Sequence, residues 1–190
     1  MLSSITPLGQ RGRGGSWLRT VTAFWIGASL AGGVVFGLLG VLGAALGVPS
    51  LNPWYSLAVL AVAAVLDLRR VRPPGPHRQV DEVWLGRYRD WVTGLGFGLQ
   101  LGAGFATIIP TFGTWALLLV AISVGIPAAI AIGVGFGVGR SLLLVFTRSI
   151  GSPSVLAETM QRFASVESRA RWLAMAGYAV VILVVGADVT

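Results

Sequence analysis

Two long stretches without a formal charge dominate the pattern of hydrophobic and polar positions. The first runs from Thr20 to Leu66 over 47 residues, and the second from Trp91 to Gly139 over 49 residues. A helix that crosses a bilayer needs about 20 apolar residues, so each stretch can hold two crossings. The pattern therefore predicts an all-α integral membrane protein.

We expect about five transmembrane helices in a single polytopic membrane domain of residues 20–190, preceded by a disordered, basic cytoplasmic segment of residues 1–19. The predicted spans cover residues 20–47, 54–68, 93–125, 126–146 and 172–187. Short amphipathic helices are expected on the cytoplasmic surface, one starting near Pro153 and one before residue 93. In the latter, Trp84, Tyr88 and Trp91 share a helical face that meets either lipid headgroups or the protein's own loops.

The third predicted span is too long for one straight helix. Thr93 to Gly125 contains 33 residues without a charge, which as a single helix would measure about 50 Å. Fitting that length into about 30 Å of hydrocarbon requires a tilt above about 50°, beyond the usual range. Pro110 lies in its middle and predicts a break there. One broken crossing makes five spans, and two short crossings make six.

The net charge is +7, and all 14 basic residues are arginine. Arginine beside a span marks the cytoplasmic side and meets anionic headgroups of the lipid bilayer. Five spans keep all the arginines inside, with the N-terminus cytoplasmic and the C-terminus external in the cell membrane. This placement favours lipid over nucleic acid. The three clusters are Arg11, Arg13 and Arg19; Arg69, Arg70, Arg72, Arg78, Arg87 and Arg89; and Arg140, Arg148, Arg162, Arg169 and Arg171.

The residues that several kinds of chemistry require are missing from this sequence. The chain has no cysteine, and His77 is its one histidine, so a thiolate or histidine metal site within one chain is not expected. No paired carboxylates or nucleophile–base set is visible. The sequence thus predicts neither an enzyme nor a bound metal or cofactor.

Glycine is concentrated inside the predicted spans, with 27 in the chain. Glycines four residues apart, such as Gly98/Gly102, Gly133/Gly137 and Gly135/Gly139, let helices in lipid approach closely. Close packing of this kind predicts a homo-oligomer or a membrane protein partner. The pattern G-x-x-L-x-x-G occurs from Gly27 to Gly33 and from Gly98 to Gly104, which indicates a parallel repeat of two halves.

A stripe of small and polar residues accompanies the predicted break. Thr93, Gln100, Thr107 and Thr114 recur every seven residues, and Gly104 and Thr111 fill intermediate positions on the same helical face. In one interpretation, exposed backbone and these side chains contact a solute. In the other, the hydroxyls stabilise a proline kink and the glutamine bonds a neighbouring helix. The candidate solute-lining residues are Gln100, Thr107, Pro110, Thr111 and Thr114.

Asp67 and Arg140 are charges at predicted cytoplasmic span ends. They either pair with each other as a gate or each meet headgroups. No carboxylate lies deep enough in a span to carry protons.

The stretch GLQLGAGFATIIPTFGTWALLL, from Gly98 to Leu119, resembles the broken helices of small repeat-built transporters. It is most similar to the CcdA/DsbD-type membrane domain of cytochrome c biogenesis, within the lysine-exporter-like group. That family carries a cysteine beside proline in each half, where this chain has Ile109-Pro110-Thr111. The first half has neither residue between Trp25 and Gly47. The resemblance therefore implies a transporter scaffold without the family's electron transfer.

Two functions are compatible with these features. The first is a small transporter or permease component for an uncharged or weakly polar solute. The second is a non-transporting assembly factor or subunit that docks partners through Gly-rich helix faces and basic cytoplasmic loops.

Overall fold

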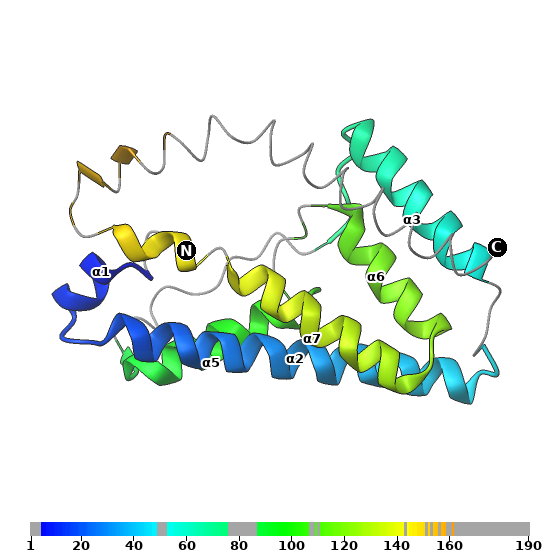
Figure 1. Ribbon diagram of the computed structural model, residues 1–190, viewed down its shortest axis with the longest axis horizontal. Coiled ribbons are helices and arrows are strands. Elements are labelled where there is room, and N and C mark those ends of the chain that lie inside the picture. The colour runs from blue at the N-terminus through cyan, green and yellow to red at the C-terminus, as the bar shows by residue number, and fades with distance from the viewer. Residues whose placement is uncertain are drawn as a thin grey trace.

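The computed structural model describes residues 5–48, 53–75, 87–106, 109, 111–142 and 144–150, with isolated positions between 152 and 161. Every regular element in these ranges is a helix, and no strand occurs among them, which confirms the predicted all-α class. The elements are α1 (Pro7–Gly12), α2 (Trp17–Ala45), α3 (Pro53–Leu68), α5 (Asp90–Gly102), α6 (Phe112–Ser123), α7 (Ile126–Leu142) and the 3-10 helix η1 (Val145–Ser149). Figure 1 shows their arrangement.

Two segments are long and apolar enough to cross a membrane. They are α2, with 29 residues, and Ile126–Ser149, with 24 residues, and each has a mean hydropathy of 2.0. The helices Trp54–Leu68 and Phe112–Ser123 are apolar but shorter. The bounds of α2, α3 and α7 closely follow the predicted spans 20–47, 54–68 and 126–146. The last predicted span, 172–187, and the surface helix near Pro153 lie outside the described residues or reach only isolated positions of them.

Helix α2 runs the length of the molecule, with α7 along it and α5 beside its N-terminal half (Figure 1). Helix α5 runs parallel to α2, because Gly94 lies against Thr20 and Gly102 lies against Ala28. Helix α7 runs antiparallel to α2, because Gly133 lies against Gly32 and the later Gly137 lies against Ala28. Helices α5 and α7 therefore both pack lengthwise against α2.

Glycine makes this arrangement possible. A methyl group added to Gly94, Gly98 or Gly102 of α5 would collide with backbone carbonyls of α2. The same holds for Gly133 and Gly137 of α7. Without a Cβ, the two backbones reach van der Waals contact, which is the main attraction available between helices in lipid. The predicted close packing at these pairs is confirmed.

The two G-x-x-L-x-x-G segments make reciprocal contacts. Gly27 faces the backbone of Leu95 and Leu99, three residues before and one after Gly98. In return, Gly98 faces Phe24 and Ala28, three residues before and one after Gly27. Equivalent glycines thus meet across a local twofold relation between parallel helices. This is the geometry that a parallel repeat predicts.

The stretch from Thr93 to Gly125 is interrupted, as predicted. Helix α5 ends at Gly102 and α6 begins at Phe112. The far end of α6 reaches the far end of α2, where Ile122 lies against Gly43. Helices α5 and α6 together therefore run in the same direction as α2. Helix α3 packs antiparallel to α6, through Leu60, Ala63 and Ala116.

The N-terminal segment differs from the predicted disorder. Thr6 caps α1 by accepting a hydrogen bond from the Gly9 N–H at 3.0 Å, and Ile5 is fully buried. The Thr147 hydroxyl donates to the Ile5 carbonyl at 3.0 Å, which ties the segment to η1. Thr6 followed by Pro7 is a helix-start signal in the sequence. The prediction of disorder rested on the Gly-, Ser- and Arg-rich composition and missed this signal.

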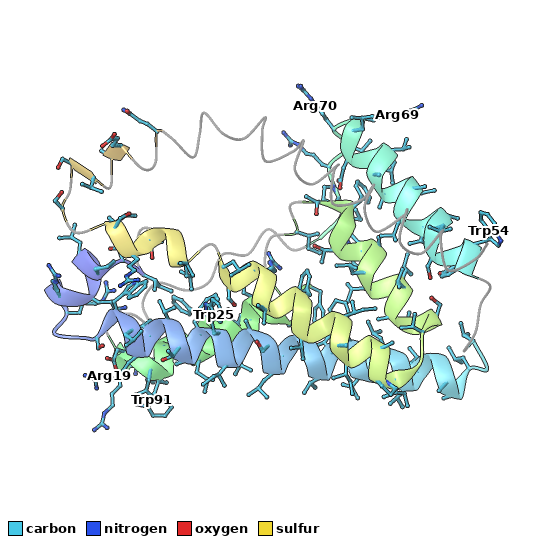
Figure 2. All side chains as sticks on the ribbon, viewed as in Figure 1. Arg19, Trp25, Trp54, Arg69, Arg70 and Trp91 are labelled. Atoms are coloured by element: carbon cyan, nitrogen blue, oxygen red, sulfur yellow. The ribbon has the colours of Figure 1, made fainter. Side chains whose placement is uncertain are left out.

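The arginines in the described ranges do not form one patch. Arg19 and Arg89 lie at the starts of α2 and α5, and Arg148 lies in η1 beside α1. Arg69 and Arg70 follow the last residues of α3, on the far side of the molecule from Arg19 (Figure 2). Of the predicted aromatic face, Tyr88 and Trp91 are each 48% exposed, and Trp84 lies outside the described residues.

The packing predicts different changes in stability when two glycines of α7 are each replaced by alanine. A methyl group at Gly137 would meet the Ala28 carbonyl, whereas nothing lies within 4 Å of one at Gly139. We expect Gly137→Ala to reduce the free energy of unfolding by about 1–3 kcal/mol. Gly139→Ala should leave it unchanged or raise it by up to about 1 kcal/mol, because alanine favours helix. Unfolding in mixed micelles with increasing dodecyl sulfate measures both, and equal losses would contradict this packing.

Candidate functional site at the interrupted helix

Two helix ends face the interruption, the C-terminus of α5 and the N-terminus of α6. Each of them is hydrogen-bonded by a charged side chain. At the end of α5, the Arg140 guanidinium donates a hydrogen bond to the Leu101 carbonyl at 3.2 Å. At the start of α6, an Asp67 carboxylate oxygen accepts one from the Phe112 N–H at 2.8 Å. The cation therefore lies at a helix C-terminus and the anion at a helix N-terminus.

This distribution matches the helix dipoles. A helix N-terminus carries a partial positive charge and unpaired N–H groups, while the C-terminus carries the opposite charge and unpaired carbonyls. Thr111, at the N-cap of α6, makes no side-chain capping bond. Asp67 from α3 takes that role from a distant part of the chain. The break is thus stabilised at both ends by tertiary contacts.

The glycine packing explains how Arg140 reaches α5. Gly102 of α5 and Gly137 of α7 both lie against the carbonyl of Ala28. Their last turns are therefore close to the same point of α2. Arg140 follows Gly137 by three residues, about one helical turn, and so reaches the carbonyl of Leu101.

An aromatic ring and a left-handed glycine complete this region. The Arg140 guanidinium carbon lies 5.4 Å from the centroid of the Phe136 ring, within the range of a cation–π contact. Gly104 has a φ of +80°, a conformation that glycine adopts without strain. A Cβ at Gly104 would lie 3.3 Å from the Phe136 ring and 3.7 Å from the Thr114 methyl group. The chain leaving α5 thus turns between α6 and α7.

The predicted solute-lining residues are divided by the break. Gln100 lies in the last turn of α5, and Thr111 and Thr114 lie at the start of α6. Thr107 and Pro110 lie outside the described residues. Because α5 ends at Gly102, the seven-residue spacing does not place Gln100 and Thr114 on one continuous helical face. Gln100 lies before the interruption and Thr114 lies after it.

Thr114 is the most enclosed of these polar side chains. It is 5% exposed, and its backbone N–H donates weakly to the Thr111 carbonyl at 3.4 Å. Within the described part of the chain, no hydrogen bond is shown for its hydroxyl. Thr114 is thus a largely buried threonine beside the interruption, next to Gly104.

Asp67 and Arg140 were predicted as a gate pair or as headgroup contacts. The bonds described above connect each of them to the backbone of the interrupted helix instead. A direct pair between the two side chains stays a prediction.

Two further residues escaped the sequence analysis. Phe136 precedes Arg140 by four residues and so shares its helical face, a spacing that could have indicated the ring–cation contact. The indole N–H of Trp25 is buried without a hydrogen-bond partner. Figure 2 marks Trp25 along α2, and no sequence pattern indicates that its N–H would be left unpaired.

Metal binding finds no support in the described ranges. They contain no group of three or more histidine, cysteine, aspartate or glutamate side chains that could hold an ion.

Comparison with known proteins gives one informative similarity. The chain is 31% identical over 119 residues to the methylamine utilization protein MauF of Paracoccus versutus. The match covers 57% of this chain and 43% of MauF, so the chain spans less than half the length of that relative. No protein-family model matches the chain, and no solved structure matches it.

The hydrogen bonds at the two helix ends predict how substitutions of Arg140 and Asp67 change the free energy of unfolding. Removing the guanidinium in Arg140→Met leaves the Leu101 carbonyl without this donor, which should cost about 1–3 kcal/mol of unfolding free energy. Asp67→Asn keeps an oxygen acceptor but loses the charge, and should cost about 0.5–1 kcal/mol and speed amide exchange at Phe112. Arg148→Met, at an exposed position of η1, is the control. A loss as large for Arg148→Met as for Arg140→Met would refute the capping role.

Proposed function

We propose that the protein is a small multi-pass membrane transporter or permease component. An uncharged or weakly polar solute would pass at the interruption between α5 and α6. The observation that carries this proposal is the pair of inner helix ends held by Asp67 and Arg140.

The free-energy cost of interrupting a helix in a membrane supports a functional role for the interruption. Backbone groups left unpaired at membrane depth cost several kcal/mol, and non-helical backbone is tolerated there where it is buried in protein or lines a cavity. Interrupted helices of this kind form the substrate sites of many repeat-built transporters.

The residues at the break indicate the solute class. Asp67 and Arg140 already interact with opposite helix dipoles, so neither presents an uncompensated charge. The groups that remain are the Gln100 amide and the hydroxyls of Thr111 and Thr114. These bind a neutral solute with a few hydrogen-bonding groups.

We also propose that α5 and α6 form one crossing among five. With 13 and 12 residues, they measure about 20 and 18 Å, each short of the hydrocarbon thickness of about 30 Å. Placed in succession they are long enough for one crossing in the direction of α2. Arg19 and Arg89 begin the two parallel segments and favour a cytoplasmic N-terminus. The C-terminus is then external.

Single cysteines test this topology directly, because the natural chain has none. We expect Ser152→Cys to be labelled by a membrane-impermeant maleimide only after the cells are opened. Thr190→Cys, at the opposite side in a five-span protein, should be labelled in intact cells, and Ser3→Cys serves as the cytoplasmic control. Labelling of Ser152→Cys in intact cells would instead support six spans.

Transport is tested in liposomes of neutral lipid. Permeation of urea, acetamide and glycerol is followed by light scattering after osmotic shock. We expect Gln100→Leu and Thr114→Val to lower the permeability for the transported solute about tenfold, since each removes a hydrogen bond worth roughly 1–1.5 kcal/mol. Thr22→Val, an exposed threonine of α2 that bonds its own helix, is the matched control.

If no probe enters faster than in protein-free liposomes, transport of these solute classes is refuted and the docking function is favoured. One observation supports that alternative. A groove of about 450 Å³ runs between α2 and α7, lined by Leu30, Gly33, Gly37, Ile130 and Val134. Its glycine floor and apolar walls suit a helix of a membrane partner.

A further inference from the structure

A cavity of about 670 Å³ opens where α1, the start of α2 and η1 meet. Figure 1 shows α1 and the start of α2 together at this end of the molecule. The volume lies in the range of about 300–1,000 Å³ that is usual for small-molecule sites. Its lining comes from three separate segments: Pro7 and Arg11 of α1, residues 15–18 at the start of α2, and Val145 and Arg148 of η1.

Hydrogen bonds between distant parts of the chain fix the walls of this cavity. The Thr147 hydroxyl donates to the Ile5 carbonyl at 3.0 Å, and the Leu8 N–H donates to the Ile150 carbonyl at 3.2 Å. The indole N–H of Trp17, at the start of α2, donates to the Thr147 hydroxyl at 3.3 Å. These bonds join α1, α2 and η1, so the cavity is built by the fold.

Two arginines without partners give the cavity a positive charge. Arg11 and Arg148 are both exposed, and among the described residues neither guanidinium has a hydrogen bond or an ion pair. The ion pair between Arg19 and Asp90 involves neither of them, and no acidic residue lines the cavity. An anion can therefore bind both arginines without displacing an existing partner.

The cavity lies at one end of both candidate membrane spans. Trp17 begins the first span and Ser149 ends the second, and the two are on the same side because α7 runs antiparallel to α2. Leu18 and Val145, which line the cavity, are 64% and 44% exposed. Trp17 combines an apolar ring with a bonded N–H, as is typical of tryptophan at a lipid–water interface. Apolar surface thus adjoins the two arginines at the level where headgroups lie.

We propose that this cavity binds the headgroup of an anionic membrane phospholipid. Arginine donates paired hydrogen bonds to phosphate oxygens, so Arg11 and Arg148 hold the phosphate from the two walls. The acyl chains extend over Leu18 and Val145, which a soluble phosphate would leave uncovered. Basic groups beside membrane spans attract anionic lipids in this way. The site is separate from the α5–α6 interruption and does not depend on the proposed transport function.

Binding is tested on the full chain in micelles of a neutral detergent. Phosphatidylglycerol and phosphatidylcholine with the same acyl chains are added in separate titrations, and native mass spectrometry counts the lipid molecules retained by each chain. The variants are Arg11→Gln and Arg148→Gln. Arg69→Gln, at an exposed arginine after α3, is the matched control for loss of one charge, and the unfolding temperature without added lipid verifies that each variant is folded.

We expect the unmodified chain to bind phosphatidylglycerol about tenfold more tightly than phosphatidylcholine. Arg11→Gln and Arg148→Gln should each weaken the Kd for phosphatidylglycerol about tenfold, as loss of one hydrogen bond between charged groups implies. Arg69→Gln should leave this Kd unchanged.

Three results would overturn the proposal. The first is equal binding of the two lipids, and the second is a loss of affinity as large in Arg69→Gln as in Arg11→Gln and Arg148→Gln. The third is displacement of bound phosphatidylglycerol by an equal concentration of inorganic phosphate, because the acyl chains would then contribute nothing to binding.

Discussion

The contact on which the rest of this structure depends is the approach of two helices to the backbone of α2 at Ala28. Gly102 from α5 and Gly137 from α7 both lie against the Ala28 carbonyl, at distances that leave no room for a side chain. Packing in lipid gains little from the hydrophobic effect, because lipid tails are as apolar as leucine. Close fit between backbones then contributes most, and glycine permits the closest fit. Ala28 therefore sets where α5 and α7 lie along α2.

That position has consequences for the interrupted helix. With Gly137 against Ala28, Arg140 reaches the last turn of α5 and bonds the Leu101 carbonyl. On the other side of the break, Asp67 reaches the start of α6 because α3 packs antiparallel to that helix. Each inner end receives a charge of the sign that its dipole favours. A break that would be costly in isolation is compensated by side chains from α3 and α7.

The sequence supported the architecture further than it supported the site. Charge-free length and Pro110 predicted an interruption between residues 93 and 125, and α5 and α6 flank it. The glycine spacing indicated which faces pack, although Gly135/Gly139 has the same spacing as Gly133/Gly137 and faces open space. Spacing alone cannot distinguish these pairs, because both recur at one helical turn. The heptad stripe through Gln100 and Thr114 failed as a continuous face for a related reason: it presumes an unbroken helix.

By itself, the sequence determined that the chain is helical, that its helices are long and apolar, and where the third of them cannot continue. These properties follow from local composition and length, which act over one or two helical turns. Only the tertiary structure decided that Asp67 and Arg140 hold the break, that Arg11 and Arg148 line one cavity, and that residues 7–12 form an ordered helix. Such contacts join residues tens of positions apart, and their partners are selected by how the backbones pack rather than by neighbouring residues.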